Sequence, residues 1–304
     1  MNDEIYMQRC LQLAANGIQG ARPNPMVGAV IVADGRILGE GYHVRCGKEH
    51  AEVNAFANVR HEDEELIIEA TLYVSLEPCS HYGKTPPCAD LIINKGVRRV
   101  VVGCVDPFAE VQGRGIQKLR DAGIEVTVGV LERECQWLNR RFFTYHREHR
   151  PFIILKWAQT VNGFIDDEGK ALQISNKQTQ MLSHQLRAEE DAILVGHTTD
   201  AREHPRLDVR HWHGPNPKRV VLTRQRSLSQ LIADLYHQGI QSLIVEGGLQ
   251  TLQSFIDAAL WDEIRVETAP VTVNDGTPAP HLPSDVMLYS MTNYDGHTVS
   301  IYVH

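Results

Sequence analysis

The chain of 304 residues carries a formal net charge of -8, and 42% of its residues are hydrophobic. This length allows two domains, each with its own core. The acidic balance argues against a general surface for nucleic acid or membranes, because both need clustered Lys and Arg, whereas a small anionic ligand needs only a few local cations.

The N-terminal residues 1–6 are acidic where a signal peptide would be basic, and no apolar run approaches the ~18 residues of a membrane span. We therefore expect a cytoplasmic protein. Six cysteines are too sparse for a disulfide scaffold in a chain of this length. Four of them are expected to be reduced and structural, namely Cys10, Cys46, Cys104 and Cys135.

The first elements follow from hydrophobic spacing and turn residues. Residues 4–16 carry apolar side chains at helical spacing and predict a helix. A turn at 22–25 precedes two predicted strands, 26–32 and 36–41. The intervening Ala33-Asp34-Gly35 predicts a hairpin between them.

Two short stretches then bring together residues that ligate metals. His50 stands at the mouth of a helix predicted from Ala51, so that His50 and Glu52 project from one helix end. Residues 71–76 are typical of a buried strand, which delivers Cys79 to the edge of a sheet. Pro86-Pro87 favours a helix start, and this places Cys88 near a helix N-terminus, where a thiolate is stabilised.

A histidine, two cysteines and a nearby carboxylate suit a catalytic zinc ion. His50, Cys79 and Cys88 would be the ligands, and Glu52 the base that does not bind metal. The order matches the zinc nucleobase deaminase signature, although eight residues rather than two separate the cysteines. Taken singly, each residue could be a surface histidine or a buried thiol. A closed structural site with His81 as a fourth ligand is a further alternative.

Strands and helices alternate after this motif, which indicates a sheet covered by helices. Helices are predicted at 89–95, 115–122 and 131–142, and strands at 98–104 and 125–130. The polar segment 144–151 ends in proline and predicts a boundary. The expected domains are therefore 1–146 and 151–304.

A second α/β unit is predicted after the boundary. Its expected strands are 152–157, 192–195, 219–223, 242–245, 264–269 and 298–303, with 298–303 closing the sheet, and its expected helices are 176–190, 228–237 and 250–260. Gly247 and Gly248 follow a strand and precede a helix, an arrangement that lets a phosphate approach backbone N–H groups. Paired glycines also end strands for steric reasons, so the pattern alone is weak. Possible anion partners are Arg187, Arg202, Arg206 and Arg210.

Pro23-Asn24-Pro25, His50-Ala51-Glu52, the stretch from Ser75 to Cys88 and the Gly-Gly segment together resemble the bifunctional riboflavin-biosynthesis deaminase/reductases over nearly the whole chain. The resemblance implies an α/β protein with a cytidine-deaminase-like N-terminal domain and a dihydrofolate-reductase-like C-terminal domain. It implies zinc-dependent deamination of a phosphorylated diaminopyrimidine, followed by NADPH reduction of its ribose to ribityl. We also expect a homo-oligomer.

The resemblance also implies roles for individual residues. In the deaminase, Glu52 would move the proton, while Asn24, His43 and Lys84 would position the ring and the phosphate. The expected cofactor-binding residues of the reductase are Ala158, Thr199, Glu203, Gly247 and Gly248. Its expected substrate-binding residues are Arg187, Leu207, Arg210 and Glu246.

The C-terminal half departs from the family pattern. Asn162-Gly163 replaces Asp-Gly, Gln173 replaces a Trp, and Glu203-His204-Pro205 replaces an Asp-rich turn. The segment between Thr223 and Leu228 is short, as though a strand and a loop were missing. We expect a working reductase that binds NADPH weakly. The alternatives are a deaminase with an idle C-terminal domain and a nucleic-acid deaminase.

Overall fold

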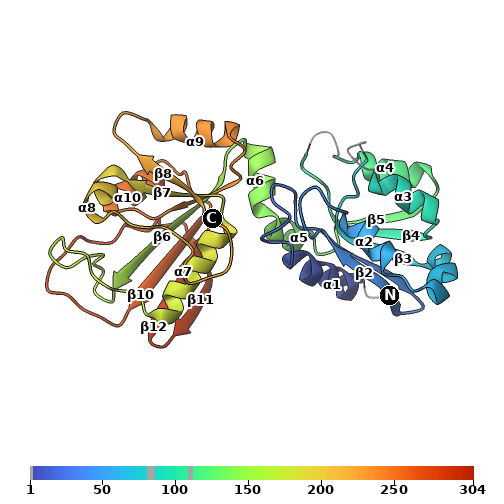
Figure 1. Cartoon of the computed structure of the whole chain (residues 1–304), viewed down its shortest axis with the longest axis horizontal. Coiled ribbons are helices and arrows are strands. Elements are labelled where there is room, and N and C mark those ends of the chain that lie inside the picture. Colours follow the sequence, from blue (N-terminus) through green and yellow to red (C-terminus); the bar gives the residue numbers. More distant parts are fainter. Residues whose placement is uncertain (1–2, 81–85, 109–111) are drawn as a thin grey trace. The chain divides into compact units, whose positions relative to one another are not determined.

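The computed structural model describes residues 3–80, 86–108 and 112–304. The chain divides into two compact units, Met1–Glu148 and His149–His304, coloured blue to green and green to red in Figure 1. Among the described residues, no helix combines the length and the apolar character needed to cross a membrane.

The first unit alternates helices with the strands of one sheet. Its elements are α1 Asp3–Ala15, β1 Gly28–Ala33, β2 Arg36–Tyr42, α2 Ala51–Ala57, η1 His61–Glu69, β3 Thr71–Leu76, α3 Cys88–Lys95, β4 Arg99–Cys104, α4 Arg114–Asp121, β5 Glu125–Val128, α5 Glu132–Leu138 and α6 Arg140–Glu148. The sheet order is β2-β1-β3-β4-β5, with β3, β4 and β5 parallel and β1 antiparallel to both of its neighbours. The carboxyl ends of β3 and β4 therefore share one edge, as the alternating pattern predicts.

Helices cover both faces of this sheet, so its central strands are buried. One face packs residues of α2, α3 and α4 against alternate residues such as Ile31 and Leu72. The other face packs α1 and α5 against Val30 and Tyr73. The predicted hairpin is present, and both Asp34 and Gly35 have positive φ, which matches a type I′ turn.

The helix predicted at 131–142 is instead two helices, α5 and α6, separated at Asn139. The Asn139 side chain accepts a hydrogen bond from the Met26 backbone N–H and donates one to the Met26 carbonyl, both at 2.8 Å. This pairing with a distant segment favours a break that local spacing does not reveal. The second helix also runs on to Glu148, through most of the stretch expected to be a polar connection.

The second unit is also an α/β structure. Its elements are β6 Phe152–Thr160, α7 Lys177–Glu189, β7 Ala192–Gly196, α8 His197–Glu203, β8 Lys218–Leu222, α9 Leu228–His237, β9 Ser242–Val245, α10 Leu249–Asp257, β10 Glu263–Ala269, β11 Met287–Tyr294 and β12 His297–Val303. The sheet order is β11-β12-β10-β6-β9-β7-β8. One face packs α9 and α10 against Ile153 and Leu155, and the other packs Leu186 of α7 against Ile154.

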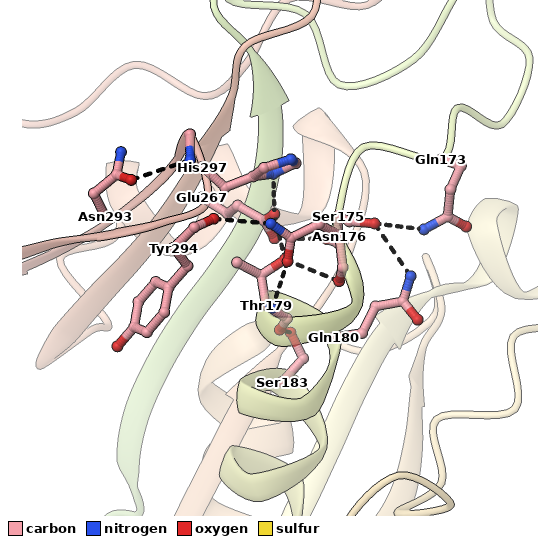
Figure 2. A network of polar contacts seen from close by, with 11 residues as sticks. Gln173, Ser175, Asn176, Thr179, Gln180, Ser183, Glu267, Asn293, Tyr294 and His297 are labelled. Atoms are coloured by element: carbon pink, nitrogen blue, oxygen red, sulfur yellow. Dashed lines mark hydrogen bonds and ion pairs between the residues drawn. The ribbon is translucent and has the colours of Figure 1, made fainter.

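A buried carboxylate fastens the start of α7 to this sheet, as Figure 2 shows. Glu267 of β10 accepts hydrogen bonds from the Ser175 hydroxyl at 2.6 Å and the Thr179 hydroxyl at 2.7 Å, and it lies 3.0 Å from Nδ1 of His297. Asn176 caps the helix by accepting the Thr179 N–H. Helix α7, which carries Arg187, is thereby anchored at its N-terminus.

Two elements of this unit were not predicted, α8 and β11. The edge strand is therefore β11, and the prediction that 298–303 closes the sheet is wrong. The short turn before α9 is confirmed, because β8 ends at Leu222 and Ser227 already caps the helix with a capping box.

Candidate active sites

Three element ends in the first unit bring together two thiols and an imidazole. His50 precedes α2, Cys79 follows β3, and Cys88 is the first residue of α3. Their ligand atoms all lie within 4.8 Å of one another. Nδ1 of His50 is 3.5 Å from Sγ of Cys79 and 3.3 Å from Sγ of Cys88.

These distances fit a tetrahedral ion. Zinc bonds of about 2.3 Å to sulfur and about 2.0 Å to nitrogen place the two ligand atoms about 3.5 Å apart. Hydrogen bonds from the Cys88 thiol and His50 lower the pKa of Cys79, which favours the thiolate that binds metal. The Cys88 backbone N–H also donates to Sγ of Cys79, over 3.2 Å. The donor set therefore fits zinc with one coordination position left open.

Glu52 lies in the first turn of α2 and is 3% exposed. Burial is the largest influence on its carboxyl group and raises its pKa to about 7. A carboxyl group of this kind can both accept and return a proton near neutral pH. Its place beside the ligands matches the expected base.

Two further predicted residues lie together next to His50. The Asn24 side-chain amide is 3.1 Å from Nε2 of His43, and Nδ1 of His43 is 2.9 Å from the Glu49 carbonyl. The rings of His43 and His50 meet edge to face at 5.4 Å. Burial lowers the pKa of His43, so its ring is neutral and can accept from Asn24 while donating to Glu49. Lys84 and His81 lie outside the described residues.

In the second unit, a cavity of about 1270 Å³ opens at the carboxyl ends of β7, β8 and β9. The predicted site residues that line it are Ala158, Arg187, Thr199, Glu203, Leu207, Glu246, Gly247 and Gly248. Arg210 is not among the described lining residues, and its exposed guanidinium pairs with Asp208. The position of the cavity agrees with the rule that ligands collect at strand ends.

An ion pair stands at the inner side of this cavity. Arg187 donates to Glu246 over 2.7 Å and 3.2 Å, and both side chains are 12% exposed. Burial alone would raise the pKa of Glu246, but the charges of Lys156 and Arg187 outweigh it and hold that pKa below its usual value. The pair is therefore fully charged at neutral pH.

The paired glycines serve different purposes. A Cβ on Gly247 would lie 2.8 Å from Cβ of Thr251, so packing against α10 requires a glycine there. Gly248 precedes α10, and a Cβ there would meet only the Thr199 hydroxyl, at 3.4 Å. Backbone N–H groups at this helix start can accept a phosphate group, so the residues present fit a dinucleotide cofactor.

Comparisons with known proteins bear on both sites. Residues 1–104 match the family model of the cytidine and deoxycytidylate deaminase zinc-binding region, and residues 151–232 and 226–288 match that of the RibD C-terminal domain. The riboflavin biosynthesis protein RibD of Aquifex aeolicus is 38% identical over 90% of this chain and 88% of its own length. RibD of Bacillus amyloliquefaciens is 33% identical over 95% of this chain and 90% of its own. The chain belongs to the RibD family.

Solved structures agree with this membership. The Thermotoga maritima diaminohydroxyphosphoribosylaminopyrimidine deaminase/5-amino-6-(5-phosphoribosylamino)uracil reductase matches with a TM-score of 0.91 at 33% identity, over 99% of this chain and 98% of that one. Acinetobacter baumannii RibD matches with a TM-score of 0.88 at 29% identity, over 99% and 98%. The protein is therefore a bifunctional enzyme of riboflavin biosynthesis, with a zinc-binding, cytidine-deaminase-like domain and a dihydrofolate-reductase-like domain that uses NADPH.

Sequence reasoning missed several residues of the RibD C-terminal domain that line the cavity, among them Lys156, Asp166, Arg224 and Thr277. Lys156 could have been found, because it is a lone cation within the apolar strand 152–157. Asp166 and Thr277 offered no local signal. They meet across the fold, where the Thr277 hydroxyl donates to Asp166 over 2.6 Å.

Proposed function

We propose that residues 1–146 form the deaminase domain and act on 2,5-diamino-6-(5-phosphoribosylamino)pyrimidin-4(3H)-one. We propose equally that residues 151–304 form a shortened but working reductase domain, which converts 5-amino-6-(5-phosphoribosylamino)uracil to its ribitylamino product. The observation that carries the first proposal is the His50, Cys79 and Cys88 donor set beside the buried Glu52. The substrates are those that the Thermotoga relative's name states.

In the deaminase, the ligands would be His50, Cys79 and Cys88. When bound there, zinc supplies an activated water as the nucleophile. Glu52 accepts a proton and returns it to the departing amine, which leaves as ammonia. Its burial beside the ligands supports this role, because a carboxyl group with a pKa near 7 exchanges protons readily at neutral pH.

Asn24 and His43 would hold the pyrimidine ring, and Lys84 would bind the substrate phosphate as a point charge. The hydrogen bond between Asn24 and His43 supports the first assignment, because it fixes the orientation of the Asn24 amide. For the second, Lys84→Ala should weaken a phosphorylated substrate far more than a dephosphorylated analogue. Equal losses on both would remove Lys84 from the phosphate site.

In the reductase, Ala158, Thr199, Glu203, Gly247 and Gly248 would contact NADPH. The substrate would be held by Arg187, Leu207, Arg210 and Glu246. NADPH supplies the hydride, and the protein needs mainly to hold the two reactants in register. Shared lining of one cavity supports every assignment except Arg210, which would have to turn from Asp208 toward the substrate phosphate.

The deaminase proposal is tested with the purified protein by measuring metal content and ammonia release from the diaminopyrimidine. We expect about one zinc per chain and ammonia release that depends on it. Full activity in a metal-free protein would refute the proposal. Cytoplasmic location and homo-oligomerisation stay predictions from the sequence, and light scattering tests the second.

A further inference from the structure

Glu77, the residue that follows β3, is a buried carboxylate to which the predicted chemistry gives no role. Its side chain is 4% exposed. One oxygen accepts the backbone N–H groups of Gly115 at 2.9 Å and Ile116 at 3.3 Å. The other accepts those of Gly113 at 2.9 Å and Asp106 at 3.3 Å. Four donors thus converge on one carboxylate.

These donors come from two places far along the chain from Glu77. Asp106 lies just beyond β4, whereas Gly113, Gly115 and Ile116 form the N-terminal turn of α4. A carboxylate is favoured there, because it satisfies N–H groups that lack partners within the helix and meets the positive end of the helix dipole. Glu77 therefore joins the end of β3 to the start of α4.

The joint continues directly into the metal site. A Cβ on Gly115 would lie 2.0 Å from the Pro78 carbonyl oxygen, so α4 touches the backbone between Glu77 and Cys79. Cys79 in turn accepts the Cys88 N–H, and its carbonyl accepts the Ala89 N–H at 3.1 Å. The turn that carries Cys79 is thus held between α4 on one side and α3 on the other.

We propose that Glu77 is a positioning residue for the metal centre, which fixes the Cys79 thiolate by clamping the Pro78–Cys79 backbone against the start of α4. This proposal rests on the proposed deaminase function. Glu77 contacts neither the ligand atoms nor the substrate, and it acts only through the backbone that it shares with Cys79. Residues of this kind, which orient ligands from outside the ligand set, typically change metal affinity or activity by 10–100-fold.

Glu77→Gln tests the proposal, because it replaces one acceptor oxygen by a donor group of similar shape. The matched control is Asp63→Asn in the same unit, where a buried carboxylate pairs with Arg36 at 2.6 Å and 2.9 Å and touches no metal ligand. Both variants should lower the melting temperature. Only Glu77→Gln should release zinc to a chelator about 10–100-fold faster, and shift the thiolate-to-cobalt absorption band of the Co²⁺-substituted protein.

In steady-state ammonia release, Glu77→Gln should lower kcat while leaving KM nearly unchanged, because the substrate contacts stay intact. Unchanged zinc release and an unchanged cobalt band, with only a lower melting temperature, would overturn the proposal. If Glu77→Gln does not fold, Glu77→Asp is measured in the same way, and failure of both to fold would show a folding role instead. A wild-type protein without zinc or ammonia release would refute the deaminase function itself.

Discussion

The two sites of this chain are built on different scales. The metal ligands meet within 4.8 Å, at element ends that their own sequence motifs define. The reductase cavity has a volume of about 1270 Å³ and draws its lining from segments throughout the second unit. A compact site fails when one ligand moves, whereas a wide one changes in proportion to the contacts it loses. The family pattern is kept at the first site and altered at the second.

Removing zinc should have the largest effect and separate the sites completely. Dialysis against a strong chelator should abolish ammonia release, because the nucleophile is generated at the metal. NADPH binding should not change, because no described lining residue of the cavity belongs to the donor set. Parallel ammonia and NADPH fluorescence assays measure both, and zinc added back should restore deamination. Lost NADPH binding would show that the sites are coupled.

Replacing the proposed base should nearly match that loss without removing the metal. Glu52→Gln keeps the shape but cannot transfer the proton, so deamination should fall by about 10²–10⁴-fold. Elemental analysis should still find about one zinc per chain. The control Glu69→Gln lies in the same unit on an exposed carboxylate and should stay active. Wild-type deamination by Glu52→Gln would exclude Glu52 as the base.

Breaking the ion pair of the cavity should be felt only in the second unit. Arg187→Ala leaves Glu246 mostly buried without its main partner, which should cost about 2–4 kcal/mol of unfolding free energy. Urea unfolding and turnover of the deaminated intermediate measure the loss, and deamination should be retained. Arg202→Ala is the control, because Arg202 is exposed and pairs only with the neighbouring Glu203 among the contacts described. Equal effects of both substitutions would contradict the account.

Acid should reveal the same pair. The pKa of Glu246 is held below its usual value of 4.5, so its contribution to stability is present above about pH 4.5 and is lost as the pH falls through the lower folded value. Glu246→Gln should therefore flatten the loss of stability of the second unit below pH 4.5. Urea unfolding of both proteins between pH 3 and pH 7 tests this, and parallel curves would contradict it.

The short turn after β8 should give the smallest effect. Arg224 is exposed, lines the cavity and has no partner among the contacts described, whereas Arg226 of the same turn pairs with Asp234. Arg224→Ala should weaken NADPH by about fivefold, since an exposed charge contributes about 1 kcal/mol at most. Titration at low and high salt measures this, with Arg219→Ala, which pairs with Asp200, as the control. An unchanged affinity at low salt would place the cofactor away from this turn.

The sequence predicts the compact site better than the wide one for a physical reason. His50, Cys79 and Cys88 stand at the ends of strongly patterned elements, so local spacing indicates where they meet. The cavity depends on pairs such as Asp166 with Thr277, which lie 111 positions apart and leave no periodic signal. Lys156 lay within reach as a lone charge in an apolar strand.

The missed elements follow the same rule. Strand β11 lacks the apolar alternation of a half-buried strand, because most of its residues are exposed. The break at Asn139 depends on its hydrogen bonds with Met26, far away in sequence. Helix α8 has seven residues and no buried ones, too few to show helical spacing. Local pattern thus predicts buried, regular elements and leaves edges and breaks to tertiary contacts.

The central claim is that the shortened second unit still binds NADPH and reduces the deaminated intermediate. It is tested most directly by titrating NADPH by fluorescence while conversion of that intermediate is followed. The account predicts saturable binding that is one to three decades weaker than that of full-length relatives, because the short turn removes a few contacts of about 1 kcal/mol each, together with measurable turnover. Neither binding nor turnover at millimolar NADPH would contradict it and leave the deaminase as the only active site.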